Sequence, residues 1–590
     1  MTFANKTDLS TSPIAQKLIE NKVPSRIHAH DGSLFNFSEE IEELASHRLG
    51  WATLASKPPL NPALVAAIAQ QARCEGLEAV ILIGQGGSTQ ASQTITKLHS
   101  LEVTDEVPFK TMDSLSPVYV SHILGSSDPA KTLYIVSSKS GSTFEPTCIS
   151  HVAWSYVCAH LGEDAAGKRF IAITDAGSQL EGVARKNGWR AVLHGQDDVG
   201  GRYSALSVFG LLPMASVGID VEEALANAVA MENLCASDSF DNPALQLATF
   251  LYSNYCNGRD KFSLLLPSRT QVFGLWAEQL VAESLGKQGV GIVPNVEVDP
   301  GILADPHKDR CAILCNMGSD QAFEHARTCL HPDIPAFRLD ILDSADMMDH
   351  FLIWEYAIAF CGWLMQVNPF DQPDVESTKI ATKQLLYGGV GNFEVPLDPQ
   401  GKPAYKELTL SESSLVANKL CVSSVLFSDG EDVEESSLNE ALRELFYSIE
   451  PGDYFSLNAF LPFRGTGRRE TLERIRHRVA DRLSTCSCLE IGPRYLHSTG
   501  QMHKGGKDNG VFLVVSSNEP YDIGVPHENF TLGQLSQAEA FGDFSALSSR
   551  GRRVIYVNLR DNSSKTLALF ADAVCNAISA AYARRRHLTE

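Results

Sequence analysis

The sequence has few basic residues compared with its acidic residues. Its 590 residues include 49 Lys and Arg against 71 Asp and Glu, which gives a formal net charge of −22. Nucleic acids and anionic membrane surfaces select for basic patches on their partners. We therefore expect neither a nucleic acid nor a membrane as a partner. An anionic small molecule would have to be held by local positive groups.

The sequence also lacks long apolar runs and paired cysteines. No run approaches the ~18 apolar residues of a membrane-spanning helix, and the N-terminal residues have no apolar core of signal-peptide length. The 13 cysteines form no Cys-x-x-Cys pair. The nearest neighbours, Cys311 with Cys315 and Cys486 with Cys488, have no histidines at zinc-finger spacing. We therefore expect a cytoplasmic protein with reduced cysteines that uses no metal and no cofactor.

A chain of this length is too long for one core and should divide into several domains. Residues 1–75 predict a helical lead-in, with one helix over Asn61–Ala72. From Gly76 onward, short apolar runs alternate with helical segments, which predicts parallel sheets with helices on both faces. We expect three α/β domains, over residues 76–225, 226–387 and 388–590. A Gly- and Pro-containing segment at 388–403 marks the start of the last one.

The apolar runs define the strands that we expect, and periodic segments define the longer helices. The expected strands are Ala79–Ile83, Thr132–Val136, Phe170–Ile173, Arg190–Leu193, Phe262–Leu266, Cys311–Cys315, Phe337–Leu339, Tyr454–Phe460, Glu490–Ile491, Val511–Val515 and Val554–Val557. The expected helices are Thr270–Leu285, Ala345–Gln366 and Thr566–Arg584.

A hydroxyl-rich loop, Ser138–Thr143, separates one of these strands from a helical segment. It offers three serine hydroxyls, one threonine hydroxyl and the ammonium group of Lys139. Free N–H groups at a helix start, together with the helix dipole, stabilise an anion there. The spacing differs from that of a nucleoside triphosphate loop, so we expect a small phosphate ester. The alternative is a helix N-cap with additional serines.

Two turns contain paired glycines. Gly84–Thr89 follows a strand and matches a dinucleotide fingerprint for two glycines, but Thr89 stands at the third position. Such a turn lets the backbone approach a ligand, or it is simply a tight turn. Val199–Ser204 places Arg202 directly after two glycines. A guanidinium there can stabilise a developing oxyanion without exchanging a proton, although a surface salt bridge is the alternative for any single arginine.

The segment Trp276–Lys287 predicts a helix on which Gln279, Glu283 and Lys287 share one face. A carboxylate beside an amide could act as the base that moves a proton between adjacent carbons next to a carbonyl. The alternative is an ordinary Glu–Lys pair one helical turn apart.

Two later segments are also rich in polar groups. Asn368–Lys379 contains two prolines that fix a turn before a new helix. Lys379 on that helix could donate a proton to a sugar oxygen, or it is a solvated lysine. Tyr495–Gly506 contains His497 and His503 beside glycines. Two histidines, whose side chains titrate near neutral pH, favour a site in this segment.

Taken in chain order, these segments resemble the glucose-6-phosphate isomerase family. The resemblance covers about residues 76–385 and implies two tandem sugar-isomerase (SIS) domains, each with a doubly wound parallel sheet, followed by the third α/β domain. Tyr495–Gly506 and Ala538–Leu559 are similar to the isomerase portion of fused transaldolase/glucose-6-phosphate isomerase proteins. The lead-in is too short for a transaldolase barrel, so only isomerase activity is implied.

The resemblance assigns a role to each candidate residue. It implies that Glu283 moves a proton between C2 and C1 of the sugar through a cis-enediol, that Arg202 steadies the enediolate, and that Lys379 acts near ring opening. The substrate-binding residues that it implies are Gly87, Ser88, Ser138, Lys139, Ser140, Thr143 and Gln279.

The family's ring-opening histidine has no recognisable counterpart between the base and Asn368. The run from His497 through Gln501 to His503 is similar to a histidine-containing run of the family, shortened and moved downstream. We therefore expect His497 to open the ring, with His307 and His503 as alternatives. The third domain would then supply this group in cis, so that either a monomer or a homodimer is expected.

The implied activity is the reversible isomerisation of glucose 6-phosphate and fructose 6-phosphate, a step of glycolysis and gluconeogenesis. The expected partner is the sugar phosphate. Two alternatives stay open: an isomerase of another sugar phosphate such as mannose 6-phosphate, and a non-catalytic regulator that binds a sugar phosphate. A regulator would need the hydroxyl-rich loop but not the base, so Glu283, Arg202 and Lys379 together favour an enzyme.

Overall fold

The computed structural model describes residues 9–103, 107–267, 270–297, 300–316, 320–341, 343–387, 406–409, 420–424, 438–462, 467–559 and 561–589. The Gly- and Pro-containing segment expected at 388–403 lies outside these residues. The chain divides into two compact units. Unit 1 comprises Met1–Asp113, Ile123–Gln372 and the short segment His497–Met502, and unit 2 comprises Ser114–His122, Pro373–Leu496 and His503–Glu590.

Unit 1 begins with short helices. Asn61 caps the longest of them by accepting a hydrogen bond from the Ala63 amide, and Pro62 occupies the first helical position, where its missing N–H costs nothing. The helices are α1 (Pro13–Glu20), α2 (Val23–His28), α3 (Glu39–Ser46) and α4 (Pro62–Cys74).

The first sheet of unit 1 has five parallel strands in the order β2-β1-β3-β4-β5. Every residue of β1 and β3 is buried, as expected for central strands covered on both faces. The strands are β1 (Ala79–Gly84), β2 (Phe109–Met112), β3 (Thr132–Ser137), β4 (Phe170–Thr174) and β5 (Ala191–His194). The helices of this region are α5 (Gly87–His99), α7 (Phe144–Leu161), α8 (Glu163–Gly167), α9 (Gln179–Lys186), α10 (Val208–Ser216), α11 (Val221–Cys235) and α12 (Pro243–Cys256). Most of α6 (Pro117–Leu124) belongs to unit 2.

The second sheet of unit 1 has four parallel strands in the order β7-β6-β8-β9. The longest helix beside this sheet, α15, is apolar on nearly all sides and almost wholly buried, as is typical of a core helix. The strands are β6 (Lys261–Leu265), β7 (Val293–Glu297), β8 (Arg310–Leu314) and β9 (Ala336–Arg338), and the helices are α13 (Gln271–Leu285), α14 (Gln321–Thr328) and α15 (Met347–Met365).

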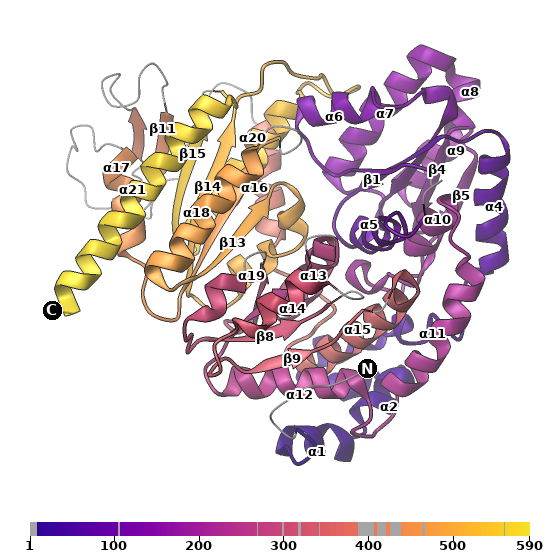
Figure 1. Cartoon of the computed structure of the whole chain (residues 1–590). Helices are drawn as coiled ribbons and strands as arrows, with labels where there is room; N and C mark the ends of the chain where they lie inside the picture. Colours follow the sequence, from indigo (N-terminus) through magenta and orange to yellow (C-terminus); the bar gives the residue numbers. More distant parts are fainter. Residues whose placement is uncertain are drawn as a thin grey trace. The chain divides into compact units, whose positions relative to one another are not determined.

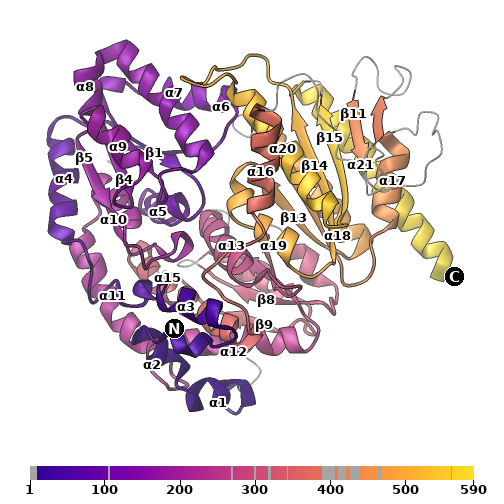
Figure 2. The ribbon, with the colours of Figure 1, turned by 180° about the vertical axis from the view of Figure 1, so that it is seen from behind.

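Unit 2 contains a mixed sheet in the order β10-β11-β15-β14-β12-β13, in which the last four strands are parallel. Figure 1 shows α18 and α21 in front of this sheet, and Figure 2 shows α16 and α20 on its other face. The strands are β10 (Lys406–Thr409), β11 (Leu420–Ser424), β12 (Tyr454–Phe460), β13 (Cys486–Ile491), β14 (Gly510–Ser517) and β15 (Arg553–Leu559). The helices are α16 (Glu376–Tyr387), α17 (Leu438–Tyr447), α18 (Arg468–Leu483), α20 (Leu532–Ser549) and α21 (Ser564–Thr589). The short helix α19 (Gly500–Gly505) begins in unit 1 and ends in unit 2.

One face of this sheet builds the apolar core of unit 2. Alternate residues of the central strands, such as Phe455, Leu457 and Leu513, pack with α17, α18 and α21, as the two-residue period of a strand requires. Among the described residues, one helix, Ser564–His587, is long and apolar enough to span a bilayer. Half of that stretch is buried, and side chains such as Phe570 belong to this core.

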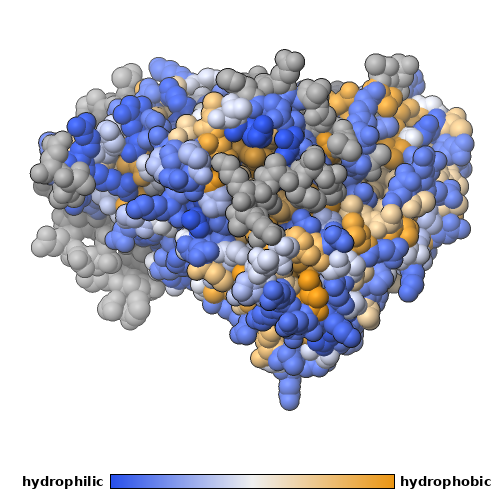
Figure 3. All heavy atoms as spheres, turned by 60° about the horizontal axis from the view of Figure 1, so that its bottom comes forward, coloured by the Kyte–Doolittle hydropathy of each residue, from blue (hydrophilic) through white to orange (hydrophobic). Residues whose placement is uncertain are grey.

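Large hydrophobic side chains that are exposed lie scattered along the chain. On the face seen in Figure 3, hydrophilic residues cover much of the described surface, with hydrophobic atoms in small groups between them. The predicted α/β class with parallel sheets is confirmed. Each of the three sheets lies within one of the three α/β domains expected from the sequence, whose boundaries stay a prediction.

Candidate active site

The glycine turn and the hydroxyl-rich loop leave neighbouring strands at the same edge of the first sheet. Gly84 at the end of β1 pairs with Ser137 at the end of β3. Ligands of open parallel sheets bind beyond the carboxyl ends of the strands. The two segments that the sequence singled out therefore lie side by side where a ligand is expected.

The hydroxyl-rich loop ends at Thr143, the N-cap residue of α7. The Thr143 side chain makes no capping hydrogen bond, and its hydroxyl lies 3.4 Å from that of Ser140. The buried Ser138 hydroxyl has no hydrogen-bond partner within the described part of the chain. Two of the expected donors thus point at each other near a helix start, and a third is free to meet a ligand.

Lys139 of this loop is held by neighbouring acceptors. Its ammonium nitrogen lies 2.9 Å from an Asp175 carboxylate oxygen and donates to the Gln196 carbonyl at 2.5 Å. Burial raises the pKa of Asp175, and the nearby Lys139 charge opposes that shift. The lysine that the sequence placed in the phosphate cradle therefore has a carboxylate partner.

Arg202 is buried at the short 3₁₀ turn Gly201–Tyr203, with 5% of its surface exposed. Its Nε donates to the Ser284 hydroxyl at 2.8 Å, and one Nη1 hydrogen bond reaches Gln372 at 3.1 Å. Its Nη2 donates to the carbonyls of Pro369 (2.6 Å) and Asp371 (2.8 Å). The surface salt bridge considered for this arginine is not what the structure shows: all three nitrogens of the planar guanidinium are held by buried or partly buried acceptors.

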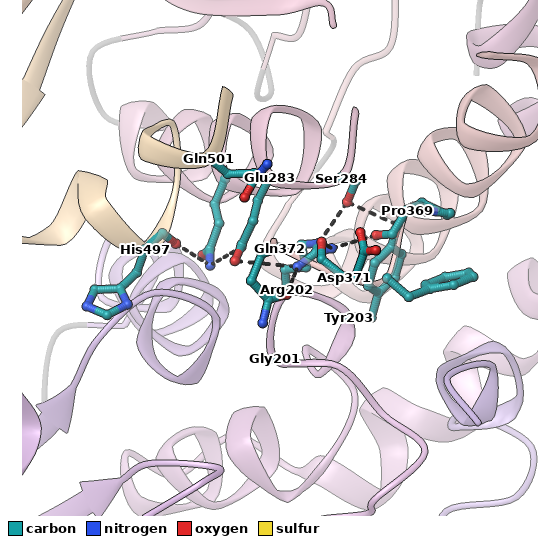
Figure 4. Close-up of polar contacts among 12 residues, drawn as sticks. Gly201, Arg202, Tyr203, Glu283, Ser284, Pro369, Asp371, Gln372, His497 and Gln501 are labelled. Atoms are coloured by element: carbon teal, nitrogen blue, oxygen red, sulfur yellow. Dashed lines mark hydrogen bonds and ion pairs between the residues drawn. The ribbon is translucent and has the colours of Figure 1, made fainter. Parts of the chain in front are cut away.

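Glu283 on α13 faces this guanidinium (Figure 4). Its Oε1 lies 3.4 Å from Arg202 Nη1, and its Oε2 accepts a hydrogen bond from Gln279 at 3.1 Å. Gln279 stands one turn earlier on the same helix, so that both side chains share one face. The same Gln279 nitrogen donates to the His497 carbonyl at 2.8 Å. The structure thus brings together four of the residues that the sequence selected.

The predicted position of Lys287 on this helix face is wrong. α13 ends at Leu285, and Gly286 turns the chain out of the helix. The ammonium group of Lys287 instead contacts the carbonyls of Asn368 and Asp371 at 2.7 and 2.6 Å. The alternative of a simple Glu–Lys pair one turn apart therefore does not describe this segment.

The glycine turn before α5 approaches the same groups. Gly86 has a positive φ of 56°, and a Cβ built there would lie 2.9 Å from Gln279 Nε2 and 3.1 Å from the His497 carbonyl. A Cβ on Gly87 would clash with the Gly201 carbonyl. Only glycine fits such close backbone contacts. The side chain of Ser88, the next predicted residue, lies outside the part that the structure describes.

Sequence reasoning missed Glu145, the buried acid in the first turn of α7. Its carboxylate lies 2.7 Å from His497 Nε2. An acidic residue at a helix start is usually explained by the helix dipole, and nothing in the local sequence links it to a histidine 352 residues away. In Figure 4 the His497 carbonyl points toward the site and its imidazole extends away from Glu283.

Three further predicted residues have other surroundings. Lys379 lies on α16 in unit 2, is about half exposed, and pairs with Glu376 at 3.2 Å. His307 is buried in unit 1, with its Nε2 2.9 Å from the Ile302 carbonyl. His503 is buried in unit 2. Burial lowers the pKa of both histidines, which makes them poorer proton carriers near neutral pH.

The described residues contain no group of three His, Cys, Asp or Glu side chains arranged to hold a metal ion. The chemistry of this site is that of a carboxylate, a fixed guanidinium and an amide. Such a set can remove a carbon-bound proton and stabilise the oxyanion that results.

Similar proteins of known structure share this fold. A hypothetical protein from Thermus thermophilus matches 65% of this chain and its own whole length, with a TM-score of 0.54 and 23% identity. A glucose-6-phosphate isomerase from Chlamydia trachomatis matches 66% of this chain and 94% of its own, with a TM-score of 0.51 and 17% identity. At these identities the likeness concerns the fold alone.

Sequence comparisons are more specific. Residues 69–298, which include Arg202, Gln279 and Glu283, match the family model described as phosphoglucose isomerase. A probable glucose-6-phosphate isomerase from Methanococcus maripaludis is 29% identical over 53% of this chain and 80% of its own length. A glucose-6-phosphate isomerase from Prochlorococcus marinus is 30% identical, and the match spans 65% of that protein.

A further relative, the glucose-6-phosphate isomerase of Mycoplasmopsis pulmonis, is 30% identical over 366 residues, which are 53% of this chain and 83% of the relative. Because this match spans most of the relative and the family model includes Arg202, Gln279 and Glu283, the chain belongs to the glucose-6-phosphate isomerase (phosphoglucose isomerase) family.

Proposed function

We propose that this protein interconverts glucose 6-phosphate and fructose 6-phosphate, with Glu283 as the base. The observation that carries the proposal is the buried Glu283 carboxylate, which has the Arg202 guanidinium 3.4 Å from one oxygen and the Gln279 amide 3.1 Å from the other. A base beside a fixed cation is what proton abstraction next to a carbonyl requires.

The reaction follows from this pair. Glu283 takes the proton from C2 of the open-chain aldose, and the electrons of that C–H bond form the C1–C2 double bond. The carbonyl oxygen O1 becomes an oxyanion, which Arg202 stabilises without losing a proton. The hydroxyl proton of O2 moves to O1, the C2 carbonyl forms, and Glu283 returns its proton to C1. Atoms and charges balance, because the carboxylate is regenerated.

Gln279 would hold a sugar hydroxyl during this transfer. Its amide nitrogen is already engaged by Glu283 and by the His497 carbonyl. Its amide oxygen is buried and, among the described residues, has no hydrogen-bond partner. A buried acceptor without a donor costs free energy. A sugar hydroxyl that donates to this oxygen would remove that cost.

The loop at the start of α7 would bind the substrate phosphate. We infer this role for Ser138, Lys139, Ser140 and Thr143, with Gly87 and Ser88 near the sugar. Binding energy from a non-reacting phosphate can position the reacting end of the sugar, where it raises the rate. Lys139 would then exchange part of its contact with Asp175 for the phosphate.

His497 is our candidate for ring opening, and Lys379 is proposed to act in the same step. Opening requires a proton to leave the hydroxyl on C1 and another to reach the ring oxygen, a task suited to an imidazole. The 2.7 Å contact with Glu145 supports the assignment, because it fixes the ring orientation. An H497A variant retains the backbone carbonyl that Gln279 needs. Undiminished turnover of cyclic glucose 6-phosphate by that variant would contradict this role.

The first experiment is a coupled assay of fructose 6-phosphate conversion with wild type, Glu283→Gln and Glu278→Gln. Glu278 lies on the same helix and is as buried as Glu283, at 8% exposed, which makes its variant a matched control. We expect a fall of roughly 100-fold or more for Glu283→Gln and less than about two-fold for the control. Binding of fructose 6-phosphate without turnover by wild type would instead identify a regulator. Faster turnover of mannose 6-phosphate would identify the other isomerase.

We further infer a cytoplasmic enzyme that acts as a monomer or homodimer without metal or cofactor and does not bind nucleic acid. Its similarity to the isomerase portion of fused transaldolase/glucose-6-phosphate isomerase proteins rests on Tyr495–Gly506 and Ala538–Leu559. Sedimentation analysis of the purified protein, with activity followed across dilution, tests the monomer against the dimer.

A further inference from the structure

The loop Asn368–Gln372 lies between two buried cations of unit 1, Arg202 and Lys287. The ammonium nitrogen of Lys287 lies 2.7 Å from the Asn368 carbonyl and 2.6 Å from the Asp371 carbonyl. Arg202 donates to the same Asp371 carbonyl at 2.8 Å. A single backbone acceptor thus connects Lys287 to the arginine that faces the base.

We propose that Lys287 is a positioning residue for the isomerisation, which holds the Asn368–Gln372 loop and thereby keeps Arg202 directed at Glu283. The proposal rests on the function proposed above. Lys287 acts through the loop and through Arg202, and no contact with the substrate is needed.

The charge of Asp371 explains why a lysine is needed here. Its carboxylate oxygen lies 2.7 Å from Lys287 Nζ, so the ammonium group neutralises it. Without Lys287, this carboxylate would compete with Glu283 for the guanidinium of Arg202, which already contacts the same residue. The buried Asn368 carbonyl would also lose its donor. Both changes would draw Arg202 away from the base and toward the loop.

The protonation of Lys287 gives this proposal a pH signature. Its side chain is 1% exposed, and burial lowers its pKa to about 8. The charges that face it are Arg202, which lowers the pKa further, and Asp371 and Glu283, which raise it. The loop should therefore lose its ammonium anchor just above neutral pH.

Stability should respond differently from activity over this range. The folded-state pKa lies below the unfolded value of 10.5, so the contribution of this group to the free energy of unfolding is smallest below pH 8 and rises toward pH 10.5. Loss of the ammonium group cannot destabilise the fold through this linkage. A fall in activity above pH 8 would then reflect the site and not unfolding.

The experiment compares the kcat and KM of wild type, Lys287→Met and Lys287→Arg between pH 6.5 and 9.5, with stability measured in parallel. We expect wild-type kcat to fall about tenfold between pH 7.5 and 9. Lys287→Met should lose about 10- to 100-fold in kcat at pH 7 with little change in KM, and it should show no alkaline decline. Lys287→Arg should recover most of the activity and move the decline above pH 9.

Lys261→Met is the matched control, because Lys261 is also fully buried and paired, with Asp260 at 2.5 Å and Asp309 at 3.4 Å. It should keep the alkaline decline of wild type. A Lys287→Met enzyme with wild-type kcat, or with an unchanged alkaline decline, overturns the proposal. If Lys287→Met fails to fold, the pH profiles of kcat for wild type and Lys287→Arg test the proposal instead. Identical alkaline declines in these two enzymes would then overturn it. An inactive wild type would instead overturn the proposed function, and this proposal with it.

Discussion

The imidazole of His497 lies 2.7 Å from the carboxylate of Glu145, at the start of the helix that follows the hydroxyl-rich loop. The backbone carbonyl of the same histidine accepts a hydrogen bond from Gln279, next to the base. One residue therefore connects the predicted phosphate loop with the helix that carries Glu283. Its side chain and its backbone make separate contacts, so a substitution can remove one and leave the other.

The variant Glu145→Gln tests the side chain. It removes the carboxylate that contacts the imidazole, and it leaves the His497 carbonyl in place. We expect ring opening, followed as the anomerisation of glucose 6-phosphate, to slow by about tenfold or more. NMR of the two anomers separates this step from proton transfer at C2. Glu163→Gln, in the first turn of the neighbouring helix α8, is the control. Equal anomerisation rates for the two variants would argue against the role of His497.

The variant Gly86→Ala tests the close approach of the glycine turn. Its new Cβ would lie 2.9 Å from Gln279 Nε2, so Gln279 must move away from Glu283 or from His497. Gly76→Ala is the control, because Gly76 also has a positive φ, 84°, with no atom near the new Cβ. Both variants should lose about 1–2 kcal/mol of stability to backbone strain. Only Gly86→Ala should also lose kcat/KM, by about 100-fold. Equal activity in both would place the turn outside the active site.

Much of the fold follows from local sequence, but four of the described strands were not predicted. The apolar runs of β1, β3, β4 and β12 coincide with the predicted strands within one residue at either end. The strands β2, β7 and β10, which lie at sheet edges, were missed, and so was β11, which pairs with both β10 and β15. β7 reads Val-Pro-Asn-Val-Glu, with a proline that only an edge strand tolerates, so its pattern does not stand out from that of a loop.

The site was predictable where one element carries its residues, and less so where distant elements meet. The four-residue spacing on a helix was enough to place Gln279 beside Glu283. The same argument failed for Lys287, because Gly286 ends the helix first. The contact between Glu145 and His497 depends on how the chain returns to unit 1 after residue 496, and no local pattern encodes that. The predicted roles of all these residues stay predictions until activity is measured.

The variant Asp349→Asn tests a buried charge outside the site. Asp349 lies in the first turn of α15, and burial, with a further effect from Asp346, raises its pKa to about 6. A raised carboxyl pKa means that its stabilising contribution is present below pH 3.8 and is lost as the pH rises through 6. We expect Asp349→Asn to raise the Tm at pH 7.5, and the gain to shrink toward pH 4.5. Calorimetry at both values measures this, with Asp164→Asn in α8 as the exposed control. A Tm of Asp349→Asn below that of wild type at pH 7.5 would contradict the predicted direction.

The variant His503→Phe separates the two histidines of the Tyr495–Gly506 segment. Within the described residues, neither ring nitrogen of His503 has a hydrogen-bond partner, and the ring packs beside Tyr454, Tyr495 and Phe512. Burial, helped by the charges of Lys504 and Arg552, lowers its pKa well below 6.5. The stability that it contributes is therefore present above pH 6.5 and is lost as the pH falls below that value.

Phenylalanine should occupy this aromatic environment without titrating, at a change of less than about 1.5 kcal/mol at pH 7. We expect denaturant unfolding of His503→Phe to vary less between pH 7 and 5 than that of wild type, whereas the exposed control His160→Phe should follow wild type. Turnover at pH 7 should stay within about two-fold of wild type, because a buried neutral ring without partners offers no path for a proton. Loss of anomerisation in His503→Phe with a wild-type rate in H497A would reverse the assignment of the two histidines.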